Sequence, residues 1–402
     1  MTEPVSVALC FDRHLALPAA TVIASAMRSA SRPLHFYLVI DRAPGLAQFL
    51  RSVLAHFGAG GTVVEATPEV ALGAEHRVYG TASTAAYRRL YLADLLPDLD
   101  RLIYLDSDVI VRHDLTELWE QPLDGRPLGA VAHGWAADSR TMLERFPNGF
   151  FNSGMLLMDL VRWRNQGVLS RVEDAVRGAV ADPGGTLPFH EEGPLNAVLV
   201  DDWQSLSPSW NFTSYFTDSA AATLRLSPEL LTAVRQDPGI MHFAGGYKPW
   251  LPDFARLSHY HIEFGQLRAE LEQSVDLAGL VWPGRFIGST ADRRHRRLRA
   301  MSLIDRARRL NLGRWSVVAK GLMAVDVLAV AREQGLDIAG VVIDNPLFRD
   351  GQFGDFAVQG LAEQIHLGCR GFLIADFRTA PLTAAYVKET ASSLGADVHI
   401  LV

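Results

Sequence analysis

Over the first 111 residues of the chain, strand-like segments alternate with segments in which apolar residues recur at helical spacing. Strand-like segments occupy residues 5–11, 34–40, 61–66 and 101–111. The segments between them repeat apolar residues at helical spacing, at 17–30, 45–58 and 84–97. Strands that alternate with helices predict an α/β fold, in which helices cover both faces of a parallel sheet. Such sheets bind ligands beyond the carboxyl ends of their strands.

A second α/β pattern begins near residue 315, after a change in amino-acid composition. Residues 281–314 are first turn-rich and then rich in arginine, which indicates a linker or a basic helix. Strand-like runs then lie at 315–321, 338–345, 371–377 and 397–402, with helical patterns at 322–335 and 358–368. We therefore predict a large domain at 1–284, a basic linker or helix at 285–314, and a smaller Rossmann-like accessory domain at 315–402.

The composition narrows the class of protein. The chain has 402 residues, which is long for a single core, and its net charge of −7 gives no reason to expect nucleic-acid binding. Its two cysteines, Cys10 and Cys369, form no metal motif and indicate no disulfide framework. The N-terminus does not read as a signal peptide, and no apolar run is long enough to span a bilayer. We expect a cytoplasmic protein, with peripheral attachment to the inner face of the membrane as the alternative.

Two carboxylates interrupt the most strand-like run of the chain. Asp106 and Asp108 lie two residues apart in "LIYLDSDVIV", so a continuous strand would present both on one face. Like charges this close repel one another unless positive charge lies between them. A divalent cation that prefers oxygen ligands, Mn²⁺ or Mg²⁺, would supply that charge, with phosphate oxygens completing its coordination. The alternative is that the strand ends at Leu105 and that both carboxylates are solvated or cap local backbone.

The later segment "IMHFAGGYKPW", residues 240–250, offers groups that complement such a cation. His242 is a suitable third ligand for Mn²⁺. Gly245 lets the backbone approach a ligand closely, and the ammonium group of Lys248 suits a diphosphate. The structural alternative is a loop that holds a core histidine and a surface lysine.

Four motifs then occur in a fixed order within residues 5–255: "LIYLDSDVIV", "FFNSGMLLMDLVRW", "EEGPLNAVL" and "MHFAGGYKPW". Together they resemble the family 8 retaining glycosyltransferases, which include bacterial lipopolysaccharide galactosyl- and glucosyltransferases and glycogenin-like enzymes. The resemblance implies a GT-A nucleotide-sugar domain that uses Mn²⁺ (or Mg²⁺) and a UDP-sugar. It further implies transfer of a hexose, galactose or glucose, to a glycan, lipid-linked or small-molecule acceptor.

The resemblance assigns roles by matching position. The metal ligands are Asp106, Asp108 and His242. The residues that contact the UDP-sugar are Asp12, Arg89, Gly245 and Lys248. The residues beside the transferred sugar are Asn152, Glu191 and Glu192. For Glu192 we expect a position beneath the anomeric carbon, where it stabilises positive charge or attacks it, and for Glu191 a contact with sugar hydroxyls. The alternative for this pair is that both are acids in the first turn of a helix, favoured there by its dipole.

The chain departs from the family pattern at several positions. His14 stands where the family commonly has asparagine, and His133 where an acidic residue often lies near the acceptor. Glu192 and Gly193 stand where glutamine and aspartate are frequent. These changes affect the identity of the sugar and of the acceptor, and they leave the metal and diphosphate positions unchanged.

The arginine-rich segment Arg293–Arg309 has two interpretations. It is either an amphipathic helix that packs between domains or a surface that meets an anionic membrane. For the C-terminal domain, a docking or dimerising role is favoured over a second nucleotide site, so a homo-oligomer is expected there. The competing functions are a nucleotidyltransferase or sugar-phosphate enzyme on a similar sheet, and a non-catalytic binding scaffold.

Overall fold

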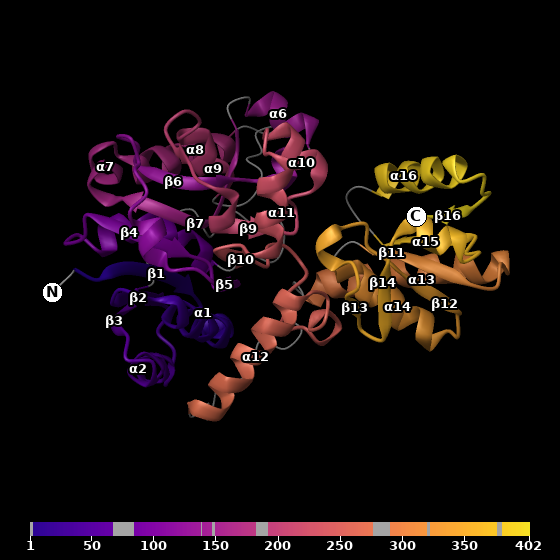
Figure 1. Cartoon of the computed structure of the whole chain (residues 1–402), viewed down its shortest axis with the longest axis horizontal. Helices are drawn as coiled ribbons and strands as arrows, with labels where there is room; N and C mark the ends of the chain where they lie inside the picture. Colours follow the sequence, from indigo (N-terminus) through magenta and orange to yellow (C-terminus); the bar gives the residue numbers. More distant parts are fainter. Residues whose placement is uncertain are drawn as a thin grey trace. The chain divides into compact units, whose positions relative to one another are not determined.

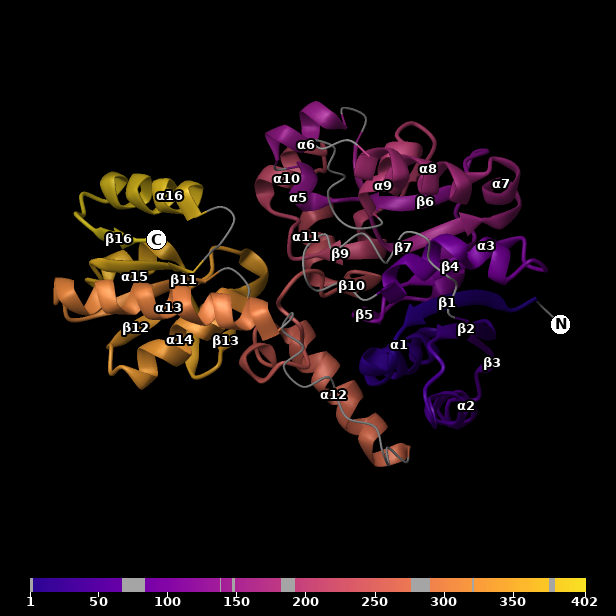
Figure 2. The same ribbon diagram turned by 180° about the vertical axis from the view of Figure 1, so that it is seen from behind.

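The computed structural model describes residues 3–66, 84–137, 139–146, 149–181, 192–275, 290–319, 322–375 and 380–402. It divides into two compact units (Figures 1 and 2). The first unit comprises residues 1–244 and 266–283, and the second comprises residues 245–265 and 284–402. Each unit is built on its own sheet flanked by helices, which confirms the predicted α/β class.

The first unit holds a seven-stranded sheet with the order β3-β2-β1-β4-β7-β6-β8. Its first four strands are parallel: β1 (Val5–Phe11), β2 (Leu34–Ile40), β3 (Gly60–Glu65) and β4 (Arg101–Leu105). The strand β7 (Phe151–Asp159) runs antiparallel to both β4 and β6 (Leu128–Ala132), and β8 (Gln204–Ser205) is parallel to β6. The expected parallel sheet is therefore correct for its first half only, and the whole sheet is mixed.

Helices cover the central strands of this sheet on both faces. All seven residues of β1 are buried, as expected of a strand covered on both faces. On one face, Ala8, Tyr104 and Leu156 from three strands pack in one cluster with Leu90 and Leu195. The helical segments of this unit are η1 (Arg13–Leu15), α1 (Ala16–Ser29), α2 (Leu46–His56), η2 (Thr84–Tyr91), α3 (Leu92–Leu95), α4 (Leu115–Trp119), α5 (Gly134–Ala137), α6 (Arg140–Arg145), α7 (Leu160–Asn165), α8 (Val168–Ala181), α9 (Glu192–Val198), η3 (Pro208–Asn211), α10 (Asp218–Thr223) and α11 (Pro228–Gln236).

The strand expected over residues 101–111 is broken in the middle, so that prediction was wrong in detail. The strand β4 ends at Leu105, and β5 (Val109–Val111) belongs to a second sheet of the same unit. That sheet has the order β5-β10-β9, with β10 (Ile240–His242) antiparallel to β5 and parallel to β9 (Phe212–Thr213). The turn between β4 and β5 therefore links two sheets, and Asp106 and Asp108 lie in it.

The second unit holds a six-stranded sheet with the order β13-β14-β12-β11-β15-β16. Its strands are β11 (Trp315–Ala319), β12 (Ile338–Val342), β13 (Gln352–Phe353), β14 (Phe356–Gln359), β15 (Gly371–Ala375) and β16 (His399–Leu401). Its helical segments are η4 (Pro252–Phe254), α13 (Thr290–Leu310), α14 (Leu322–Glu333), η5 (Pro346–Phe348), α15 (Leu361–His366) and α16 (Ala380–Ser393). The helix α12 (His259–Ser274) contains the boundary between the units. The helix expected at 358–368 begins only at Leu361, after β14.

The arginine-rich segment forms the helix α13, which packs along α14. Arg296, 8% exposed, pairs with Asp326 at 2.7 Å, and Arg297 pairs with Glu333 at 2.6 Å. These contacts show that α13 packs within the second unit. Packing between domains and contact with an anionic membrane both stay predictions. Among the described residues, no helix is long and apolar enough to cross a membrane.

Residues 245–265 pack against strands of the second unit. The hydroxyl of Tyr247 donates to the carbonyl of Ala319 at 3.2 Å, at the end of β11. The rings of Phe254 and Phe353 meet edge to face, with centroids 5.1 Å apart. The segment that begins at Gly245 is thus held by residues from the last hundred positions of the chain.

The Arg296–Asp326 pair gives a test of how α13 is held. Replacing Asp326 with Ala leaves the guanidinium of Arg296 buried and without its counter-ion, so we expect the free energy of unfolding to fall by roughly 2–4 kcal/mol. Replacing Glu333 with Ala breaks the more exposed pair on the same helix, and the loss there should stay below about 1 kcal/mol. Urea denaturation of both variants measures the difference. Equal losses would show that burial of the Arg296 pair does not hold α13 in place.

Candidate active site

The turn between β4 and β5 brings the two aspartates beside His242. The carboxylates of Asp106 and Asp108 lie 3.9 Å and 3.3 Å from Nε2 of His242. One ligand atom from each of the three residues lies within 4.8 Å of the others. The sheet register explains the convergence, because His242 of β10 pairs with Val109 of β5, the residue after Asp108. A continuous strand is therefore not needed to bring these groups together.

One oxygen of Asp106 is held by the protein itself. Oδ1 accepts a hydrogen bond from the hydroxyl of Tyr104 at 2.6 Å and lies 2.9 Å from the guanidinium of Arg89. Burial raises the pKa of the Tyr104 hydroxyl well above its usual value, so the group stays protonated and donates. The other oxygen, Oδ2, is the one directed toward His242. The donor set of two carboxylates and one imidazole suits Mn²⁺, and its spacing allows all three groups to reach one ion.

Arg89 has structural partners in this arrangement. The residue is 5% exposed, and its guanidinium donates to the carbonyl and the hydroxyl of Ser153 at 2.7 Å and 2.9 Å. It also lies over the ring of Tyr104, 4.7 Å from the centroid. These contacts place positive charge next to Asp106 inside the protein. A direct contact between Arg89 and the donor stays a prediction.

Glu192 is buried next to Asn152 at the start of α9. Its Oε2 accepts hydrogen bonds from Nδ2 of Asn152 at 3.0 Å and from the backbone N–H of Ser153 at 2.9 Å. Its Oε1 lies 3.7 Å from Nε2 of His133. Burial, and to a smaller extent the nearby His242, lower the pKa of His133 to about 4, so this imidazole is neutral near pH 7. The structure thus brings together two of the three residues expected beside the sugar, and Glu191 lies outside the described residues.

A hydrogen-bonded residue that the sequence analysis missed connects these two groups. Asn211, at the end of η3, lies 2.8 Å from Nδ1 of His242 and 2.8 Å from Oδ1 of Asn152. The pairing of β9 with β10 explains its position, since Thr213 lies opposite His242. No local pattern marks Asn211, because its role depends on a contact between strands about thirty residues apart in sequence.

The structure gives the remaining predicted residues other contacts. Asp12 caps the short helix η1 by accepting from the backbone N–H of His14 at 2.9 Å. Gly245 and Lys248 belong to the second unit. Gly245 has a positive φ of 79°, which favours glycine, and Nζ of Lys248 lies 5.9 Å from the ring centroid of Trp250. Their contacts with a donor diphosphate stay predictions.

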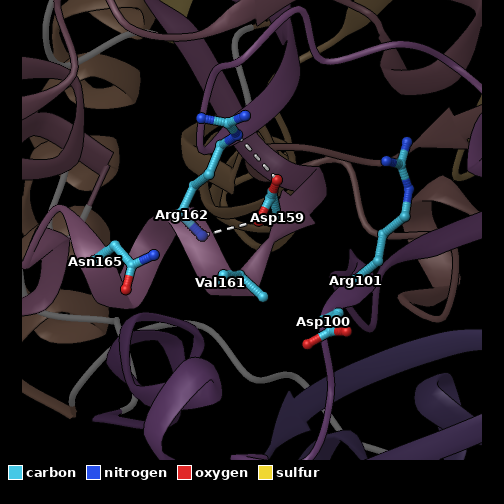
Figure 3. Close-up of a pocket in the computed structure, with 6 residues that line it drawn as sticks. All are labelled: Asp100, Arg101, Asp159, Val161, Arg162 and Asn165. Atoms are coloured by element: carbon cyan, nitrogen blue, oxygen red, sulfur yellow. Dashed lines mark hydrogen bonds and ion pairs between the residues drawn. The ribbon is translucent and has the colours of Figure 1, made fainter.

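The first unit carries an open depression (Figure 3). It is lined by residues that include Asp100, Arg101 and Asp159, with an ion pair between Asp159 and Arg162 at 3.2 Å. Arg101 begins β4 and Asp106 follows its end, so the two lie about 17 Å apart along the strand. The depression therefore lies at the opposite end of β4 from Asp106 and the other two metal-ligand candidates.

Comparisons with known proteins identify relatives of this chain. The sequence model of the family described as "Glycosyl transferase family 8" matches residues 6–253. The chain is 31% identical over 181 residues to General stress protein A of Bacillus subtilis, covering 44% of this chain and 63% of that protein. It is 26% identical over 246 residues to Glycosyltransferase GlyF of Streptococcus pneumoniae, covering 61% of this chain and 57% of that protein. The matched regions thus span less than two thirds of these relatives.

Solved structures share the fold. The galactosyltransferase LgtC, in complex with donor and acceptor sugar analogs, matches with a TM-score of 0.57 and 20% identity, covering 67% of this chain and 96% of that chain. The apo structure of the bifunctional glycosyltransferase WbbM matches with a TM-score of 0.52 and 18% identity, covering 70% of this chain and 51% of that chain. This likeness confirms the predicted GT-A architecture.

The contact between Gly154 and His242 gives a test of the site's packing. A Cβ atom at residue 154 would lie 2.2 Å from Cε1 of His242, so Gly154→Ala must displace the imidazole. We expect the free energy of unfolding to fall by about 1–3 kcal/mol and a crystal structure to show the ring moved. Gly178→Ala is the control, because nothing lies within 4 Å of that position and alanine favours helix there. An unmoved imidazole in Gly154→Ala would refute this packing.

Proposed function

The chain belongs to glycosyl transferase family 8, and on that premise we propose that it transfers a hexose from a UDP-sugar to a hydroxyl acceptor with retention of configuration. The observation that carries the proposal is the convergence of Asp106, Asp108 and His242 beside the buried pair of Asn152 and Glu192. Galactose or glucose is the proposed sugar. A glycan, a lipid-linked sugar or a small molecule is the proposed acceptor.

Asp106, Asp108 and His242 would hold the metal ion, Mn²⁺ or Mg²⁺. When bound, the ion supplies Lewis-acid stabilisation to the charge that builds on the diphosphate leaving group. Asp106 is prepared for this role, because Arg89 and Tyr104 fix its Oδ1 and leave Oδ2 directed toward His242. On the family resemblance, Asp12, Gly245 and Lys248 are proposed to bind the nucleotide and its diphosphate.

Glu192 is proposed to stand beneath the anomeric carbon. Bonds from Asn152 and Ser153 fix one oxygen of its carboxylate, so the group is oriented without help from solvent. A fixed carboxylate stabilises the positive charge that develops on the sugar ring. His133, which is neutral near pH 7, lies on the side of the other oxygen, so we propose that it faces the acceptor.

The first prediction from the proposed function concerns the donor and the metal. We expect the protein to release UDP from a UDP-hexose in the presence of Mn²⁺, and to release far less GDP or dTDP from the corresponding sugars. Asp106→Asn and Asp108→Asn should each lower Mn²⁺-dependent binding of UDP by roughly a hundredfold or more, because each removes a charged ligand. Release of nucleoside diphosphate across a donor panel and calorimetry with UDP are the measurements.

The matched control is Asp100→Asn, which neutralises an aspartate at the opposite end of β4 and should leave both readouts unchanged. Full turnover by both site variants in chelator-treated buffer would end the proposal of metal dependence. Binding of UDP without release from any donor would favour a binding scaffold instead.

The second prediction concerns Glu192→Gln, which keeps the size of the side chain and an oxygen for the bonds from Asn152 and Ser153. A covalent nucleophile at this position predicts a loss in kcat of several orders of magnitude with donor binding retained. A purely electrostatic role predicts a loss on the order of ten- to a thousandfold. Single-turnover kinetics separate the two, with Glu173→Gln, which lies on α8, as the control. An unchanged kcat would leave Glu192 with a structural role only.

A further inference from the structure

We propose that Asn211 is a positioning residue that fixes the tautomer of His242 and couples this metal-ligand candidate to Glu192. The proposal deepens the proposed function and rests on it for the role of the metal. The four side chains involved form one chain of hydrogen bonds inside the first unit: His242, Asn211, Asn152 and Glu192. All four are at most 8% exposed, so the protein rather than bulk water has to satisfy their polar atoms.

One backbone N–H fixes which groups donate and which accept along this series of hydrogen bonds. The N–H of Gly154 lies 3.1 Å from Oδ1 of Asn152, and a backbone N–H only donates. The oxygen of the Asn152 amide therefore faces Gly154, and its Nδ2 faces Glu192 at 3.0 Å. A carboxylate oxygen accepts at that position, which agrees with the assignment.

The orientation of Asn152 fixes that of Asn211. The atom of Asn211 that lies 2.8 Å from Oδ1 of Asn152 has to be a donor, so it is Nδ2. The oxygen of Asn211 then faces Nδ1 of His242 at 2.8 Å and can only accept. Nδ1 of His242 consequently carries a proton, and in the neutral ring the lone pair belongs to Nε2.

Nε2 is the nitrogen that lies 3.3 Å from Oδ1 of Asp108 and 3.9 Å from Oδ2 of Asp106. Asn211 therefore aims the coordinating lone pair of the imidazole at the space the two carboxylates share. Partners of this kind orient ligating histidines and raise their basicity. Because Nδ2 of the same amide holds Asn152, a shift of His242 is transmitted to the residue that orients Glu192.

Two substitutions distinguish the hydrogen bond that Asn211 makes with His242 from the one it makes with Asn152. Asn211→Asp is isosteric and still accepts from Nδ1 of His242, but it cannot donate to Oδ1 of Asn152. We expect it to bind Mn²⁺ with UDP as tightly as the unmodified protein or more tightly, while kcat falls because Asn152 and Glu192 lose their support. Asn211→Leu removes both bonds at similar volume. We expect it to weaken Mn²⁺ binding by about ten- to a hundredfold.

The direct readout is the tautomer of His242, from the imidazole ¹⁵N spectrum of histidine-labelled full-length protein, with and without Mg²⁺ and UDP. His242→Gln identifies the signal by its loss. We expect the proton on Nδ1 in the unmodified protein and in Asn211→Asp, and a shift of the proton to Nε2 in Asn211→Leu. Asn196→Leu is the control, because Asn196 is a buried asparagine that bonds the backbone of Phe151 and Glu192 and makes no bond with His242. It should leave the tautomer unchanged.

A proton on Nε2 alone in the unmodified protein would overturn the proposal, even if Asn211→Leu does not fold. So would a folded Asn211→Leu with an unchanged tautomer and unchanged Mn²⁺ affinity. Failure of the proposed function gives a different result: the unmodified protein would bind no Mn²⁺ with UDP, while the tautomer would still report on Asn211.

Discussion

The repulsion between the carboxylates of Asp106 and Asp108 is the constraint on which the rest of the site depends. Both groups lie within reach of a single ion, in a turn flanked by buried strands. Such a pair is unfavourable unless positive charge compensates it. Arg89 supplies part of that charge to one oxygen of Asp106. Oδ2 of Asp106 and Oδ1 of Asp108 face the imidazole of His242, and a divalent cation would satisfy all three groups at once.

The scaffold meets this constraint by joining two sheets at the turn. The strand β4 fixes Asp106 through the large sheet, and β5 fixes Asp108 through its pairing with β10. The same small sheet places His242 and Asn211 side by side. His242 is thus placed by backbone pairing, and each aspartate directly adjoins a paired strand residue. Such placement is more precise than placement by a surface loop. The second unit holds the segment that follows His242, so the motif at 240–250 spans both units.

Local pattern predicted the strands and helices that rest on hydrophobic spacing, from β1 to α2 and again from β11 to β12. It also singled out Asp106, Asp108 and His242, because their chemistry is unusual for their surroundings. It missed the break after Leu105, since an apolar run looks the same whether it pairs with one sheet or with two. The antiparallel course of β7 and the bonds of Asn211 depend on contacts between distant segments, which single-sequence spacing does not encode.

Anomalous scattering at the manganese edge tests the central claim most directly. In crystals of the full chain grown with Mn²⁺ and UDP, we expect one strong peak within about 2.0–2.3 Å of a carboxylate oxygen of each aspartate and of Nε2 of His242, distances typical of such ligands. That result would show that the paired carboxylates serve a cation. Bound UDP with no anomalous peak between these three side chains would contradict the account.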